Sequence, residues 1–230
     1  MTPPPLPLLE TLKIRSLNGR TFSGPRIIEI LRLAANLVQC IFDDVDPVSY
    51  IDHTAEKLVL PRLRRLMFGP DAYPDSNDNI LNSLSLPTLE ALSVSFLNLT
   101  IDDLISLLVR SMPPLQVLIL GEGLESFDLY RCLTLVPTIT RFEIWWSDSN
   151  IFRDLFATLA DSPSLSPNLR SLTIYMTVHN LQGPDISYSS WETLIRALSA
   201  RRTRLQVVRV VLDGSPPPQK TPRCIEGTGG

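Results

Sequence analysis

Leu86-Pro87-Thr88-Leu89-Glu90-Ala91-Leu92-Ser93-Val94 is the stretch that decides the fold of this 230-residue chain. From residue 89 it reads Leu-x-x-Leu-x-Val, so its last apolar positions alternate with polar or small ones. Side chains of a β-strand alternate between two faces, which predicts a strand with residues 92 and 94 on one face. The same phrase occurs eight times along the chain, with Ile, Val, Phe or Cys at some apolar positions.

The eight copies begin between 24 and 36 residues apart. A period in the twenties with this spacing is typical of leucine-rich repeats. One unit cannot bury its apolar face alone, whereas stacked units share a continuous core. The sequence therefore predicts an α/β leucine-rich-repeat solenoid, a curved horseshoe segment of about eight parallel strands with helices on the convex side. The predicted inward triplets are Leu9/Leu12/Ile14, Leu37/Cys40/Phe42, Leu63/Leu66/Phe68, Leu89/Leu92/Val94, Leu115/Leu118/Leu120, Ile139/Phe142/Ile144, Leu169/Leu172/Ile174 and Leu205/Val208/Val210.

Apolar stripes at helical spacing lie in four of the returning segments, and each predicts one buried helix face. Two other connections, residues 43–57 and 69–83, are rich in Asp, Pro and Asn, so we expect irregular turns with at most a short helix. The four stripes are Ile27/Ile30/Leu31/Ala34, Ile101/Leu104/Leu107/Leu108, Phe152/Leu155/Phe156/Leu159 and Trp191/Leu194/Ile195/Leu198.

Composition predicts one leucine-rich-repeat domain over residues 1–213 and a disordered tail, rich in Pro and Gly, over residues 214–230. A chain that is 44% hydrophobic can bury a sizeable core. The net charge of −3 gives no global field that favours nucleic acid. The basic run over residues 196–209 is interpreted as solvated surface.

Three scattered cysteines are typical of a reducing compartment. The first residues do not form a signal peptide, and no apolar run reaches the roughly 20 residues that span a membrane. We therefore expect an intracellular protein, cytoplasmic or nuclear, with neither membrane nor nucleic acid as a partner.

A search for catalytic or metal-binding chemistry gives no constellation of residues. His53 and His179 are the only histidines, and the sequence identifies no nucleophile beside them. Residues 75–79, Asp-Ser-Asn-Asp-Asn, resemble the start of a calcium loop, but Ile80 and Leu86 stand where such a loop requires Gly and Glu. We expect no enzyme, no cofactor and no metal. An enzyme would need a Ser, a His and an acid that meet in one pocket.

The outward positions of the strands are the candidate binding surface, because they form a ribbon across the stacked repeats. Aromatic, Met and Arg residues are enriched at the centres of protein interfaces. Sheet propensity alone is the alternative explanation for Ile, Val, Trp and Tyr at such positions. The candidate protein-binding residues on this concave face are Arg65, Met67, Ile119, Arg141, Glu143, Trp145, Thr173, Tyr175 and Arg209.

The amino-acid sequence of the repeats, beyond their spacing, also resembles that of a known protein family. Leu-Pro-Leu-Leu-Glu-Thr-Leu-Lys-Ile from Leu6, Leu-Leu-Val-Arg-Ser-Met-Pro-Pro-Leu from Leu107 and Arg-Cys-Leu-Thr-Leu-Val-Pro-Thr-Ile-Thr from Arg131 resemble the repeat region of mushroom-type (basidiomycete) F-box proteins. The resemblance covers residues 6–212 and implies the substrate-binding repeats of a ubiquitin-ligase receptor. In that family the F-box recruits a Skp1–cullin ligase.

No F-box segment is found ahead of the first repeat or elsewhere in the chain. We therefore expect either a fragment or a protein that works without the F-box, with Skp1–cullin as a partner only if an F-box lies upstream. The alternative is a stand-alone leucine-rich-repeat scaffold or regulator unrelated to ubiquitin. Neither terminus is predicted to cap the stack, so exposed apolar edges predict self-association.

Overall fold

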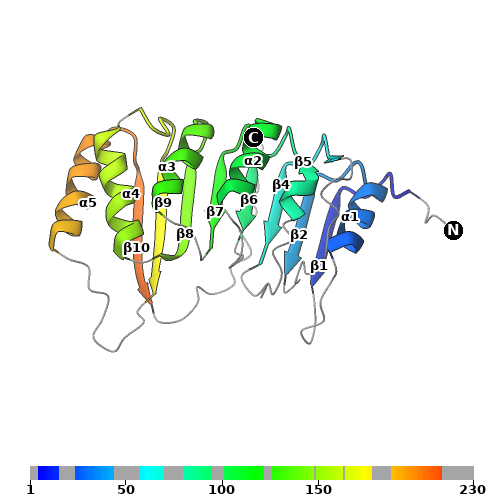
Figure 1. The fold of residues 1–230 in the computed structure, drawn as a ribbon, viewed down its shortest axis with the longest axis horizontal. Helices are drawn as coiled ribbons and strands as arrows, with labels where there is room; N and C mark the ends of the chain where they lie inside the picture. The colour runs from blue at the N-terminus through cyan, green and yellow to red at the C-terminus, as the bar shows by residue number, and fades with distance from the viewer. Residues whose placement is uncertain are drawn as a thin grey trace, which may run out of the picture.

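The computed structural model describes residues 5–15, 24–43, 57–69, 80–94, 101–121, 126–147, 149–162, 164–177 and 188–213. It is an α/β structure built on one eight-stranded sheet (Figure 1). Every strand of this sheet is parallel to its neighbours, and the strands follow one another in chain order, which confirms the prediction of eight parallel strands. The strands are β1 (Thr11–Arg15), β2 (Gln39–Asp43), β4 (Arg65–Phe68), β6 (Ala91–Val94), β7 (Val117–Leu120), β8 (Arg141–Ser147), β9 (Ser171–Thr177) and β10 (Val207–Asp213).

Five α-helices of the described chain lie in one layer on one face of this sheet (Figure 1). They are α1 (Gly24–Leu33), α2 (Ile101–Ser111), α3 (Ser126–Leu135), α4 (Ser149–Asp161) and α5 (Tyr188–Ala200). In the predicted stripes of α1, α2 and α4, every described residue is buried or half-buried. The prediction for α5 is wrong in part: Leu194 is buried, whereas Trp191 and Ile195 are exposed. This happens because α5 is the outermost helix of the layer and has a helix neighbour on one side only (Figure 1).

A second, smaller sheet of two strands lies in the middle of the described chain. It pairs β3 (Leu58–Val59) with β5 (Leu84–Ser85) in parallel, and the short 3-10 helix η1 (Ile80–Ser83) precedes β5. The short helix agrees with the expectation for residues 69–83, whereas the two-residue strands were not predicted. Most of the connection over residues 43–57, and the whole predicted tail over residues 214–230, lie outside the described residues.

The core lies between the sheet and the helix layer. All members of the six central triplets, from Leu37/Cys40/Phe42 to Leu169/Leu172/Ile174, are buried, as the repeated phrase predicts. The triplets of β1 and β10 are only half-buried, although they pack against the same core. Each of these terminal strands has a neighbouring strand on one side only, so one flank of its side chains has no strand to cover it.

Polar side chains join successive copies of the phrase where the strands begin. In four copies, the residue just before the first apolar position donates a side-chain hydrogen bond to a backbone carbonyl of the preceding copy. The bonds are Asn36 Nδ2 to Pro7 O at 2.8 Å, Thr88 Oγ1 to Pro61 O at 2.9 Å, Thr138 Oγ1 to Leu115 O at 2.7 Å and Asn168 Nδ2 to Pro137 O at 3.1 Å. These bonds link neighbouring units at the strand starts, in addition to the backbone bonds of the sheet.

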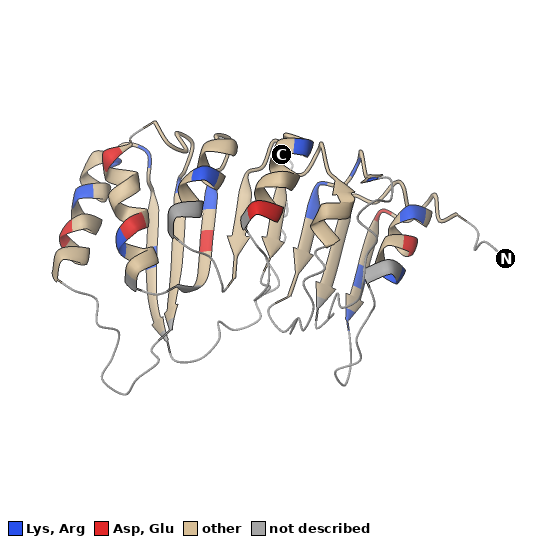
Figure 2. Ribbon diagram, in the orientation of Figure 1, with Lys and Arg blue, Asp and Glu red and all other residues tan. Residues whose placement is uncertain are grey.

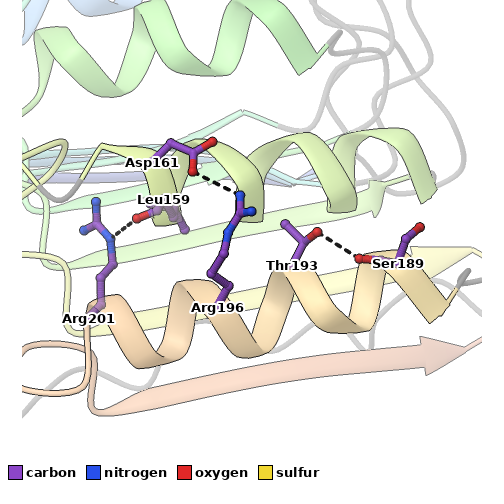
Figure 3. Close-up of polar contacts among 6 residues, drawn as sticks. All are labelled: Leu159, Asp161, Ser189, Thr193, Arg196 and Arg201. Carbon is purple, nitrogen blue, oxygen red and sulfur yellow. Dashed lines mark hydrogen bonds and ion pairs between the residues drawn. The ribbon is translucent and has the colours of Figure 1, made fainter.

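Arg201 corrects the interpretation of residues 196–209 as solvated surface. Its side chain is only 3% exposed and donates to backbone carbonyls at the end of α4 and in the turn that follows (Figure 3). Nε donates to Leu159 O at 2.9 Å and Nη2 to Ser162 O at 2.8 Å and Leu165 O at 2.7 Å, while Nη1 lies 3.4 Å from Ser166 O. Helix ends leave carbonyls without intrahelical partners, and Arg201 supplies those donors from the next unit.

Candidate functional site

The predicted binding residues lie on the face of the sheet opposite the helices, because they alternate with core residues along each strand. Strand register brings four of them into one row across the sheet. Ile119 of β7 pairs with Glu143 of β8, Glu143 with Thr173 of β9, and Thr173 with Arg209 of β10. Strands in a sheet are about 4.8 Å apart, so residues distant in sequence become direct neighbours here.

Three further predicted residues join this row from β8 and β9. Arg141 precedes Glu143 on the same face of β8, and Trp145 and Tyr175 meet edge to face with ring centroids 6.4 Å apart and planes at 85°. A register irregularity of β8 between Ile144 and Ser147 lies beside this aromatic pair. We call Arg141, Glu143, Trp145, Thr173, Tyr175 and Arg209 the β8–β10 cluster.

Arg65 and Met67 lie apart from this cluster. Both belong to β4, and β6 and β7 separate β4 from β8 in the sheet. Three strand intervals amount to about 14 Å. The structure therefore divides the predicted residues into the cluster, with Ile119 at its border, and a separate pair on β4.

Burial divides the cluster into two kinds of residue. Glu143 and Thr173 are buried, as is the neighbouring Ile119, although all three face away from the helix layer. Each is flanked in its row by register partners on both sides, which accounts for much of this burial. Arg141 and Arg209 are exposed. A partner would meet the two arginines and the half-buried aromatic pair first.

An ion pair fixes the middle of the cluster. Arg141 Nε donates to Glu143 Oε1 at 2.8 Å, and the arginine side chain is 44% exposed whereas that of Glu143 is 8% exposed. Burial raises the pKa of Tyr175, and the charge of Glu143 raises it further, while Arg209 and Arg141 oppose the shift. The phenol therefore stays protonated at neutral pH.

In the described chain, charged positions are more frequent on the helices than on the strands, and β8 carries a basic and an acidic position close together (Figure 2). The cluster thus combines one buried carboxylate, two arginines and two aromatic rings. This combination is suited to recognising a polar group beside an apolar one. It includes neither a histidine nor a cysteine that would supply a nucleophile or a general base.

The two described cysteines, Cys40 and Cys132, have unreactive thiols in the folded protein. Burial raises the pKa of both Cys40 and Cys132 to about 12, so both thiols remain protonated at physiological pH. The thiolate is the reactive form, so neither side chain is a nucleophile in the folded protein.

The other sequence candidates for chemistry, His53, His179 and residues 75–79, lie outside the described residues. Within the part of the chain that the structure describes, no group of three or more His, Cys, Asp or Glu side chains could hold a metal ion. No described helix has the length and apolar character needed to cross a bilayer.

A separate groove of about 530 Å³ lies where the strands begin, and sequence reasoning did not identify it. Its charged lining includes Arg62, Arg64, Glu10 and Glu90. Arg64 and Glu90 lie 3.7 Å apart across neighbouring units, and Arg62 reaches Asn36 Oδ1 at 3.4 Å. Several polar groups of the groove therefore already contact one another between neighbouring units. This indicates a structural role for the groove rather than a binding site.

Comparison with known proteins gives no match. No family model, no curated protein and no solved structure matches the chain.

Proposed function

We propose that this chain is a leucine-rich-repeat solenoid that serves as a non-enzymatic protein-interaction module. The repeated phrase, the burial of its six central triplets and the hydrogen bonds between successive strand starts support the repeat assignment. Each unit supplies one strand of the parallel sheet. A solenoid of this type exposes an extended concave surface for binding, because every strand contributes outward side chains to it.

The β8–β10 cluster is the proposed binding site. The observation that carries this proposal is the convergence of Arg141, Trp145, Tyr175 and Arg209 on three adjacent strands, around the buried carboxylate of Glu143. Tyr, Trp and Arg are the side chains that most often dominate binding energy at interfaces. Sheet propensity alone explains Trp and Tyr, but it does not account for a buried glutamate paired with an arginine.

The resemblance to mushroom-type F-box proteins gives the module its proposed role. In that role the repeats hold a protein substrate, and a Skp1–cullin ubiquitin ligase is recruited only through an F-box upstream. The protein would act in the cytoplasm or nucleus. The alternative is a stand-alone leucine-rich-repeat scaffold or regulator with no link to ubiquitin.

Quantitative affinity capture from native extract tests the binding site. The bait is the full chain, compared with a variant that combines Tyr175→Ala and Arg209→Glu. The control is Arg153→Glu, which changes a half-exposed arginine on the helix layer. We expect a partner that the wild type and the control enrich equally and the double variant does not. Equal enrichment by all three proteins would contradict the proposed site.

Binding to Skp1 separates the two roles. The informative bait is the protein encoded by the longest open reading frame that contains this chain. In the ubiquitin-ligase role, Skp1 would be recruited through an F-box ahead of the repeats. Direct binding of purified Skp1 to that bait supports the ubiquitin-ligase role. No binding by a bait that captures its partner through the cluster supports the stand-alone scaffold instead.

A further inference from the structure

Helix α5 carries an exposed apolar stripe at one end of the molecule. Tyr188 is 80% exposed, Trp191 39% and Ile195 62%, and the three residues recur at helical spacing along one flank. Within the described chain, α2 and α3 expose shorter apolar sets, and the exposed described positions of α1 are Arg26, Glu29 and Arg32. Single exposed apolar residues are ordinary, whereas a continuous stripe with two aromatic rings marks a contact surface.

Tyr188 and Ile195 of this stripe are mostly exposed, whereas the Trp191 ring also meets Phe152 of α4 edge to face, with ring centroids 5.9 Å apart. Arg196 reaches across to Asp161 of α4 at 3.0 Å, so that flank of α5 is turned toward α4 (Figure 3). Ile195 lies about 100° around the helix from Arg196, because successive helical residues are that far apart. Ser190, Leu194 and Ala197 fill the buried face. Tyr188 and Ile195 therefore lie on the outer flank of α5, which is the last helix of the layer, and Trp191 lies between this flank and α4 (Figure 1).

Apolar side chains of strand β10, at the same end of the sheet, are also partly exposed. Leu172 and Ile174 of β9 are fully buried, whereas their register partners Val208 and Val210 of β10 are only half-buried. Leu212, on the same face of β10, is 47% exposed. A helix with an apolar flank would cover both surfaces if it lay beside α5 and over β10.

We propose that a second copy of this chain supplies that helix, and that the two copies form a two-fold dimer through α5. In this arrangement each α5 lies beside the other copy's α5 and over the other copy's β10. The contact uses the same patch on both copies, as a two-fold interface requires. The inference does not rest on the proposed function, because it uses the end of the stack rather than the β8–β10 cluster.

Charge and area favour this occupant over a head-to-tail one. The outermost helix at the opposite end, α1, exposes Arg26, Glu29 and Arg32, so the helix itself does not match an apolar stripe, although Leu6 and Leu8 just before β1 are 42% and 93% exposed. Exposed parts of the stripe and of Leu212 amount to on the order of 500 Å², and the half-buried residues of β10 add to this area. A stable interface buries about 800 Å² per partner, so the patch is of the size that a dimer needs.

Sedimentation velocity of the full chain, from low to high micromolar concentration, tests the proposal. The variants are Ile195→Lys on α5 and Leu212→Lys on β10. The matched control is Val109→Lys, which adds the same charge at a 56% exposed apolar position of α2. Circular dichroism confirms that each variant keeps its secondary structure.

We expect a reversible monomer–dimer equilibrium for the wild type and the control. Either α5 or β10 variant should weaken association by on the order of a hundredfold, because each dimer then contains two charges in an apolar contact. A wild type that stays monomeric at high micromolar concentration overturns the proposal and indicates another cover for this end. Oligomers that grow beyond the dimer overturn the two-fold arrangement in favour of head-to-tail association. Equal weakening by the control also overturns it.

Discussion

Replacing Arg201 with Ala should destabilise the protein severely, although sequence alone marks this residue as one of a basic surface run. The side chain is 3% exposed and donates to four backbone carbonyls, three of them within 2.9 Å. A buried carbonyl that loses its partner costs about 1–3 kcal/mol. Ser162 O and Ser166 O also accept from the backbone N–H groups of Leu165 and Leu169, so the loss of the arginine donor matters mainly at Leu159 O and Leu165 O. We therefore expect a loss of about 3–5 kcal/mol in the free energy of unfolding rather than the sum over four carbonyls.

Arg196→Ala is the matched control, because it removes the same type of side chain from α5, just before the turn that contains Arg201 (Figure 3). Arg196 pairs with Asp161 at 3.0 Å, but both side chains are mostly exposed, and such pairs contribute about 0–1 kcal/mol. Urea unfolding followed by circular dichroism gives both values. Equal losses in the two variants, or a loss below about 1 kcal/mol for Arg201→Ala, would refute the assignment of Arg201 as a buried donor to the carbonyls at the end of α4.

Three further predictions follow from burial and charge. Leu118→Asp should lose several kcal/mol of stability, because it leaves a charge in the core, whereas Lys13→Asp on the outward face should stay within about half a kcal/mol; comparable losses in urea unfolding would contradict the inward and outward assignment. The thiol of Cys132 should resist alkylation in the native protein and react after unfolding, by peptide mass spectrometry, so rapid native labelling would contradict its burial and raised pKa. Glu143→Gln should lower the raised pKa of Tyr175, because the removed negative charge opposes formation of the phenolate; an unchanged ultraviolet titration, measured against Tyr175→Phe, would show that the two groups are not coupled.

The repeated phrase was sufficient to predict the sheet, because burial and period-two alternation act together at every copy. Leu66, Leu92 and Leu118 stand at the same phrase position and become register neighbours in adjacent strands. The outward group on β8–β10 followed from the same alternation. Its internal geometry did not, because neither the edge-to-face contact of Trp145 with Tyr175 nor the register irregularity of β8 beside it follows from period-two alternation.

Features that depend on contacts between units were not predictable from local pattern. The run over residues 196–209 reads as polar surface, yet Arg201 is buried because it meets carbonyls some forty residues earlier in the chain. Strands β3 and β5 have two residues each, too short for any periodic signal. The stripe on α5 has the periodicity of a buried face, and only the position of α5 at the end of the layer leaves it exposed.

Site-directed photo-crosslinking tests most directly whether the cluster is the binding surface. p-Benzoylphenylalanine replaces Tyr175 on the outward face in one protein and Tyr130, a 46% exposed tyrosine of α3, in the other. Both are irradiated in native extract, and the adducts are identified by mass spectrometry. The proposed function predicts a discrete protein adduct from position 175 that position 130 does not give. Adducts from position 130 alone, or the same adducts from both positions, would contradict binding through the β8–β10 cluster.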